Sequence, residues 1–218
     1  MEISPRKSAK DRSVEVLDSA RELFFENGYR GTTIQQIADR AGYSKRTVYL
    51  DYRNKDELFM FVCAEGAELM LSKLERIPAD ELPVEEGVER VLDVLLDFSR
   101  EHREYFRMIF SEATPEIIAN CSEELQKSVA TLERALMSVV VRLTVRATEE
   151  GSIAAVDPWE TAGIFVGTAT GIVLLSMGGS QTVFSQKSLE SLVKKAIRTF
   201  WRGLQTDPPA AETWLREE

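Results

Sequence analysis

Three residues that can hydrogen-bond to nucleic-acid bases stand together in the first quarter of the chain. Lys45, Arg46 and Thr47 follow Ser44, a residue type that begins helices by accepting a bond from a later backbone N–H. Arg and Lys can donate to guanine O6 and N7, and Thr can contact a thymine methyl group or a phosphate. Residues on the first turn of a helix meet base edges when the helix enters a major groove. The spacing therefore predicts recognition of DNA.

A helix-turn-helix is predicted to position these side chains. Thr33 and Gln36 fit the S/T-x-x-E/Q capping box, so a helix begins at Thr33. Gly42 ends that helix by permitting a left-handed turn residue, and Ser44 begins the second helix. The residues expected to face the core are Ile34, Ile37, Ala38 and Ala41 of the first helix and Val48 and Tyr52 of the second.

Over about residues 11–60 the chain resembles the DNA-binding domain of the TetR (tetracycline repressor) family. The matching residues are Gly28-Tyr29, Thr32-Thr33-Ile34, Ile37-Ala38, Ala41-Gly42, Ser44, Thr47, Tyr49 and Asn54-Lys55-x-x-Leu58, with Ala20, Leu23 and Phe24 in the preceding helix. The resemblance implies that Tyr49 and Lys55 contact phosphates. Backbone N–H groups at the helix start near Thr33 would hold another phosphate. The expected DNA-binding residues are Thr33, Ser44, Lys45, Arg46, Thr47, Tyr49 and Lys55.

The chain departs from the family at the end of the recognition helix. Leu50-Asp51 stands where the family usually has an aromatic residue and a histidine, and Tyr52 replaces the usual phenylalanine. Asp51 is a carboxylate in a region that should approach phosphates. It either repels them or pairs with a neighbour such as Arg53.

The charge of the chain is unevenly distributed. The formal net charge is −9, yet residues 1–55 hold 11 basic and 8 acidic residues, and the remainder holds 16 and 28. The positive segment coincides with the helix-turn-helix, so its local field favours DNA. The acidic remainder should face away from DNA.

Enzyme and metal sites lack the residues that they need. His102 is the single histidine and ends a charged helix, which predicts a surface or capping role. Cys63 and Cys121 are expected to be reduced, buried thiols, with a redox pair as the alternative. No metal-ligand spacing, phosphate loop or dinucleotide fingerprint is present, so we expect neither metal nor cofactor nor catalysis. Residues 161–186 are uncharged, but their Gly, Ser and Thr content disfavours a membrane span.

Hydrophobic periodicity predicts an all-α fold of about nine helices. The expected ranges are 11–27, 33–41, 44–52, 54–76, 84–100, 104–111, 115–149, 157–177 and 188–204. We expect a flexible basic arm at 1–10 and a DNA-binding domain at 11–56. A helical effector-binding and dimerisation domain follows at 57–206, and a tail at 207–218.

One late helix carries glycine at every fourth position. Gly163, Gly167 and Gly171 share a face, although each costs a helix roughly 1 kcal/mol relative to alanine. Close approach of another helix would explain them, from the same chain or from a partner. The resemblance implies a partner, because TetR-type proteins dimerise through their last two helices. The expected interface is Gly163, Gly167, Gly171, Leu189, Val193, Phe200 and Trp201.

The resemblance also implies an effector pocket in the central helices. Its candidate lining is Phe59, Phe61, Phe106, Met108, Phe110, Trp159 and Phe165, although residues of these types more often simply fill a helical core. Together these features predict a cytoplasmic, homodimeric regulator that binds an inverted-repeat operator and is most simply a repressor released by a small molecule. The alternatives are a helical ligand-binding protein that no longer binds DNA, and a three-helix unit used only for packing.

Overall fold

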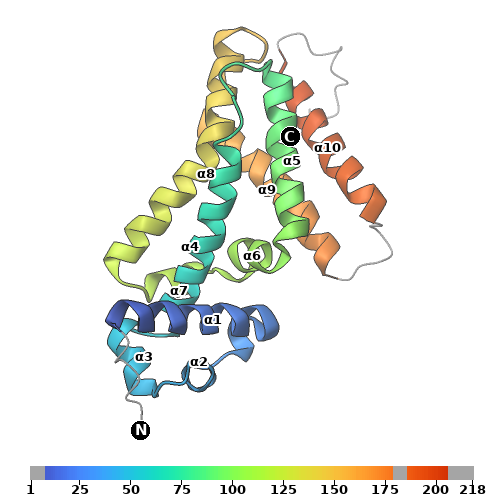
Figure 1. The fold of residues 1–218 in the computed structure, drawn as a ribbon. Helices are drawn as coiled ribbons and strands as arrows, with labels where there is room; N and C mark the ends of the chain where they lie inside the picture. Colours follow the sequence, from blue (N-terminus) through green and yellow to red (C-terminus); the bar gives the residue numbers. More distant parts are fainter. Residues whose placement is uncertain (1–7, 179–185, 206–218) are drawn as a thin grey trace, which may run out of the picture. The chain divides into compact units, whose positions relative to one another are not determined.

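The computed structural model describes residues 8–178 and 186–205, which form ten α-helices and one π-helical turn, η1 (Figure 1). The elements are α1 Ala9–Gly31, α2 Ile34–Ala41, α3 Lys45–Asp51, α4 Lys55–Leu74, α5 Val84–Glu101, α6 Arg103–Arg107, η1 Met108–Glu112, α7 Pro115–Ala119, α8 Glu123–Glu149, α9 Pro158–Met177 and α10 Gln186–Gly203. Within these residues no β-strand is present, and one isolated bridge joins Ile153 to Gln205. The all-α expectation is therefore confirmed.

Two expected boundaries were wrong. Helix α1 begins at Ala9, because Ser8 and Asp11 form a capping box, so residues 8–10 belong to a helix and not to an arm. The helix expected at 115–149 is broken between α7 and α8. There the Asn120 side chain donates to Asp56 (2.7 Å) and its carbonyl accepts from Asn54 (2.9 Å), so bonds to the start of α4 replace helix continuation. Residues 1–7 and the expected tail at 207–218 lie outside the described residues.

The chain forms two compact units. The first comprises Met1–Leu71 with Arg100–Arg134, and the second Ser72–Ser99 with Ala135–Glu218. The helix-turn-helix thus shares a unit with the first part of α4 and with α6, η1 and α7. The expected functional boundary at residue 57 divides DNA binding from effector binding, and it stays a prediction.

One continuous hydrophobic core holds the first unit together. Its buried side chains come from α1, α2, α3, α4, η1, α7 and α8, and include Val16, Ala20, Phe24, Ile37, Ala38, Val48, Tyr52, Leu58, Phe59 and Met108. The predicted burial of Val48 and Tyr52 is confirmed, at 0% and 5% exposure. The recognition helix is therefore seated on the same core as α1 and α4.

In the second unit, α9 packs beside α10. The buried side chains of these two helices include Ala162, Phe165, Ala169, Val173, Val193, Ile197 and Trp201. Arg198 of α10 pairs with Glu89 of α5 (2.6 Å), and Lys194 pairs with Asp93 (2.7 Å). Apolar packing and ion pairs thus both fix α10 within this unit.

Candidate nucleic-acid interface

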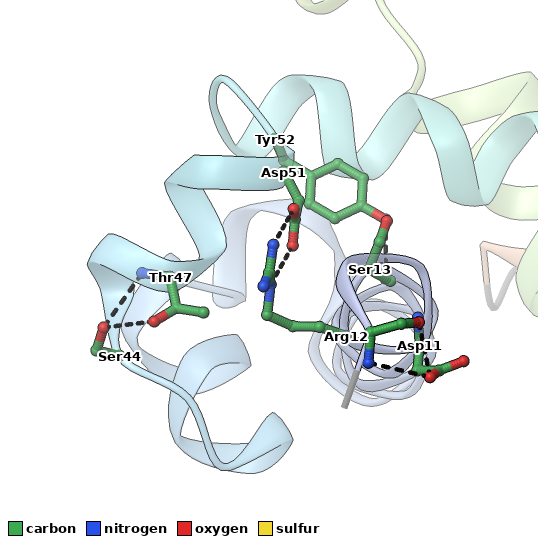
Figure 2. Close-up of polar contacts among 8 residues, drawn as sticks. Asp11, Arg12, Ser13, Ser44, Thr47, Asp51 and Tyr52 are labelled. Carbon is green, nitrogen blue, oxygen red and sulfur yellow. Dashed lines mark hydrogen bonds and ion pairs between the residues drawn. The ribbon is translucent and has the colours of Figure 1, made fainter. Parts of the chain in front are cut away.

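The turn that leads into α3 has the geometry that its sequence predicts. Gly42 adopts a left-handed conformation (φ 75°), and the Tyr43 N–H donates to the Ala38 carbonyl (2.8 Å). Ser44 then caps α3, since its Oγ accepts from the Thr47 N–H (3.1 Å) and lies 2.8 Å from Thr47 Oγ1 (Figure 2). These bonds fix the first turn of α3, which carries Lys45 and Arg46.

The other end of α3 is held by α1. Arg12 donates from Nε and Nη2 to the two carboxylate oxygens of Asp51, at 2.8 and 2.7 Å (Figure 2). The neighbouring Tyr52 hydroxyl donates to the Ser13 carbonyl (2.9 Å). The Arg12 and Asp51 side chains are only 22% and 12% exposed, and the bonds to Asp51 raise the pKa of Arg12. Both ends of the recognition helix are therefore anchored.

This pairing supports the second expectation for Asp51, an ion pair within the protein. The carboxylate is neutralised by a cation, and the partner is Arg12 of α1, not Arg53. Because the two residues are 39 positions apart, no local pattern could have identified the pair. Arg12 is the positioning residue that sequence reasoning missed, and Asp51 was singled out without its true partner.

The outer face of α3 is accessible. Lys45 and Arg46 are exposed, Tyr49 is 52% exposed and Leu50 is 70% exposed. Thr47 is partly buried, with its hydroxyl beside Ser44. The structure thus brings Lys45, Arg46 and Tyr49 to one accessible surface and leaves Thr47 at its edge.

Two other expected phosphate contacts are engaged within the protein. The Thr33 N–H and hydroxyl both donate to Gln36 Oε1 (2.8 Å each), which completes the predicted capping box of α2. Lys55 Nζ donates to the carbonyls of Tyr29 (2.9 Å) and Thr32 (3.0 Å) and lies 3.9 Å from the centre of the Tyr29 ring. Burial lowers the pKa of Lys55. An ammonium group has three donors, so one remains for a phosphate.

The end of α1 is held by η1 as well as by α4. Gly28 has φ 68°, which ends the regular part of α1 as predicted. The next N–H, that of Tyr29, donates to Glu112 Oε2 of η1 (2.9 Å), and Arg107 pairs with the same carboxylate (3.2 Å). The Tyr29 hydroxyl donates to Asp56 of α4. The chain just before the helix-turn-helix is therefore bonded to two later elements.

The candidate effector residues fall in different surroundings. Phe59 and Met108 are fully buried in the core of the first unit, and Phe59 packs edge-on against Phe24 with ring centres 5.2 Å apart. Phe106 is buried beside the half-buried Phe110, at 4.7 Å between ring centres. Phe61 is 36% exposed against Tyr52. In the second unit Phe165 is fully buried, whereas Trp159 is 47% exposed.

The candidate dimer residues divide by exposure. A Cβ atom built on Gly163, Gly167 or Gly171 meets nothing within 4 Å, so no other helix among residues 8–178 and 186–205 packs closely on the glycine face. Val193 and Trp201 are 0% and 4% exposed and face the core of their own unit. The accessible surface beside them includes Ile164, Leu175 and Leu192, with Leu189 and Phe200 half-buried.

The remaining reactive side chains lie in ordinary structural places. His102 is the N-cap of α6, with Nε2 3.9 Å from Glu101 Oε2. Cys63 and Cys121 are buried free thiols. Burial raises the pKa of Cys63 and raises that of Cys121 to about 11, so both thiols are protonated at neutral pH.

Comparison with known proteins identifies the kind of molecule to which this interface belongs. The family model of bacterial regulatory proteins of the tetR family matches residues 16–60, which include α2 and α3. The chain belongs to the TetR family. An uncharacterised helix-turn-helix transcriptional regulator of Bacillus subtilis, YhgD, is 27% identical over 156 residues, which cover 72% of this chain and 79% of that protein.

Two further matches agree with this assignment. The repressor AcnR of Corynebacterium jeikeium is 35% identical over 71 residues, which cover 33% of this chain and 35% of that protein. A tetR-family regulatory protein from Rhodococcus RHA1 has the same fold, with a TM-score of 0.67 at 17% identity, covering 89% of this chain and 97% of that one. This TetR-family chain is therefore a helix-turn-helix transcriptional regulator, as the sequence predicted.

Proposed function

We propose that this TetR-family regulator is a homodimeric repressor that binds an inverted-repeat operator through α3. The observation that carries the proposal is a recognition helix anchored at both ends while its outer face stays accessible. Ser44 fixes the first turn and Asp51 the last. Lys45, Arg46 and Thr47 then read base edges, and Tyr49 and the remaining donor of Lys55 contact phosphates.

The proposed dimer buries the glycine face of α9. Gly163, Gly167 and Gly171 have open space above them, and Ile164 and Leu175 on the same helix are 52% and 63% exposed. Among the described helices, α9 is the one that is long and apolar enough to span a membrane. Only a third of its most apolar 18-residue stretch is buried within this chain. A second copy packed against this face would cover the apolar surface. Two-fold symmetry then presents two recognition helices about one DNA turn, ~34–36 Å, apart.

The proposed effector is a small apolar or aromatic molecule. Support comes from the aromatic candidates Phe61 and Phe110 of the first unit, which keep accessible or half-buried surface. Effector binding would shift the elements that hold the end of α1, through the Glu112 bond to the Tyr29 N–H. Operator affinity would then fall, because the two half-sites demand a fixed spacing of the reading helices. Such a repressor acts where the genome is, in the cytoplasm.

Selection of bound sequences from a random DNA pool with the purified full chain tests the proposal. The expected result is enrichment of an inverted repeat that binds far more tightly than scrambled DNA, with an affinity that falls steeply with salt. A pool without enrichment, together with binding that is insensitive to salt, would leave a helical protein that does not recognise DNA. Repression is measured separately, by placing the selected operator between a promoter and a reporter gene.

A further inference from the structure

The most exposed large hydrophobic side chain among the described residues lies on the recognition helix. Leu50 is 70% exposed, more than Leu175 (63%) or Ile164 (52%) on the face proposed for dimerisation. Isolated exposed leucines are common on protein surfaces and need no explanation by themselves. The direction in which Leu50 points is what distinguishes it.

The helical geometry of α3 places Leu50 opposite its core-facing side. Val48, the fully buried residue of α3, marks the inward direction. Each residue advances about 100° around an α-helix, so Arg46 and Leu50, two positions before and after Val48, each lie about 160° from it. They are therefore only about 40° apart and flank the outward axis. A surface that approaches α3 from the side opposite Val48 therefore contacts Arg46 and Leu50 first.

The anchors of α3 hold this direction constant. Leu50 immediately precedes Asp51, whose carboxylate is fixed by two bonds from Arg12, and Tyr52, whose hydroxyl is bonded to Ser13 (Figure 2). Rotation of α3 about its axis would break these bonds. Leu50 is thus a rigidly presented apolar group one helical turn after the exposed cation Arg46.

We infer that Leu50 is a specificity-determining residue that packs against the C5-methyl group of a thymine in each operator half-site. The inference rests on the proposed function, in which α3 enters the major groove. Of the chemical groups that a base edge presents in that groove, the thymine methyl is the apolar one. The exposed cations Lys45 and Arg46 on the same helix give this surface a positive charge, which argues for DNA as its occupant. The thymine should lie next to the base that Arg46 reads.

The test deletes the methyl group from DNA without altering base pairing. In duplexes that carry the selected operator, each thymine is replaced in turn by deoxyuridine, symmetrically in both half-sites. Affinities are measured for the parent, Leu50→Ala, Leu50→Met and the control Val145→Ala, which shortens an exposed aliphatic side chain on α8. Circular dichroism establishes that each variant is folded.

At one thymine position, replacement by deoxyuridine should lower the operator affinity of the parent and the control roughly fourfold per half-site. This factor corresponds to the free energy of burying about one methyl group. Leu50→Ala should bind the thymine operator more weakly by a similar factor and become insensitive to deoxyuridine there, whereas Leu50→Met should stay sensitive. An unchanged deoxyuridine profile in Leu50→Ala, or a parent that is insensitive at every thymine, overturns the inference while leaving operator binding intact. Failure to select any operator instead removes the proposed function, and the inference falls with it.

Discussion

Helices α3 and α9 both expose an outer face, and the two faces are built in opposite ways. The face of α3 carries cations, a tyrosine and a leucine; the N-cap Ser44 fixes the first turn of the helix, and bonds from α1 hold the last. The face of α9 carries three glycines with open space above them and has no charged residue between Thr161 and Met177. One surface presents groups that project, and the other presents almost bare backbone.

The difference indicates what each surface can recognise. Projecting donors on an anchored helix suit a ligand with a pattern of hydrogen-bonding groups, such as a DNA groove. A glycine face offers no such pattern, but it lets another helix approach closely and gain van der Waals contact. Substitutions on the two helices should therefore have different effects. Those on α9 should change the oligomeric state of the protein, and those on α3 should change its preference for DNA sequence.

The largest effect is expected for Gly167→Leu on α9. The added side chain would hold a partner helix away from the face, so the dimer should dissociate or change the spacing of its reading helices. Operator affinity should fall by ~100-fold or more, since a monomer meets only one half-site. Sedimentation velocity and operator titration measure the two consequences.

Gly203→Leu is the matched control, because Gly203 near the end of α10 also has nothing within 4 Å of a built Cβ. It should leave the oligomeric state unchanged. A monomeric parent at micromolar concentration, or an operator-competent Gly167→Leu dimer of unaltered size, would show that the glycine face is not the dimer interface.

The next largest effect is expected for Arg46→Ala on α3. The truncation should weaken operator binding by roughly 1–3 kcal/mol and relax sequence preference at one base pair of each half-site, because a bidentate contact to guanine is lost. The protein should remain dimeric, which separates this variant from Gly167→Leu. Repeating the random-pool selection with the variant measures the preference directly, and an unaltered consensus would contradict a base-reading role.

A smaller loss is expected when the anchor of α3 is released. Asp51→Asn and Arg12→Gln should each lower operator affinity several-fold, and the double variant should be no worse than either alone, because both remove the same ion pair. A double-variant cycle on operator and scrambled DNA measures this. Tighter binding of Asp51→Asn to both DNAs at low salt would show instead that the carboxylate repels phosphates.

The smallest effect on DNA is expected for Lys55→Met. Two carbonyl bonds and a ring contact are lost, so the free energy of unfolding should fall by about 1–2 kcal/mol. The slope of log affinity against log salt should fall by about one unit, because the remaining N–H donor of Lys55 is proposed to hold a phosphate. Urea unfolding and a salt titration give the two quantities, and an unchanged salt slope would show that Lys55 acts only through its contacts within the protein.

Local signals in the sequence were sufficient for the helix-turn-helix. Its helix starts and its turn depend on bonds within four residues, so they can be predicted without tertiary information. These features are the Thr33–Gln36 capping box, the left-handed Gly42 and the N-cap Ser44. The start of α9 is equally local, because the Asp157 side chain accepts from the Trp159 and Glu160 N–H groups.

Features that depend on distant residues could not be predicted. The pairing of Asp51 with Arg12 and the break near Asn120 arise from partners 39 and 64 residues away. An apolar stripe continues through the break between α7 and α8, so periodicity alone predicted one helix. The open space over the glycines of α9 is likewise invisible in sequence, because spacing shows a shared face but not what covers it.

Because the Tyr29 N–H donates to Glu112, this one backbone proton can report whether η1 still holds the end of α1. Because this proton is bonded to a carboxylate, its exchange with deuterated solvent requires that η1 release the end of α1. In a spectrum of the labelled protein, the Tyr29 amide would exchange slowly while η1 is docked, and faster once a bound molecule pulls η1 away. Compounds could therefore be screened for whether they disturb the contact between η1 and the end of α1, by following the amide resonance of Tyr29. Such a screen needs neither the operator nor a regulated gene.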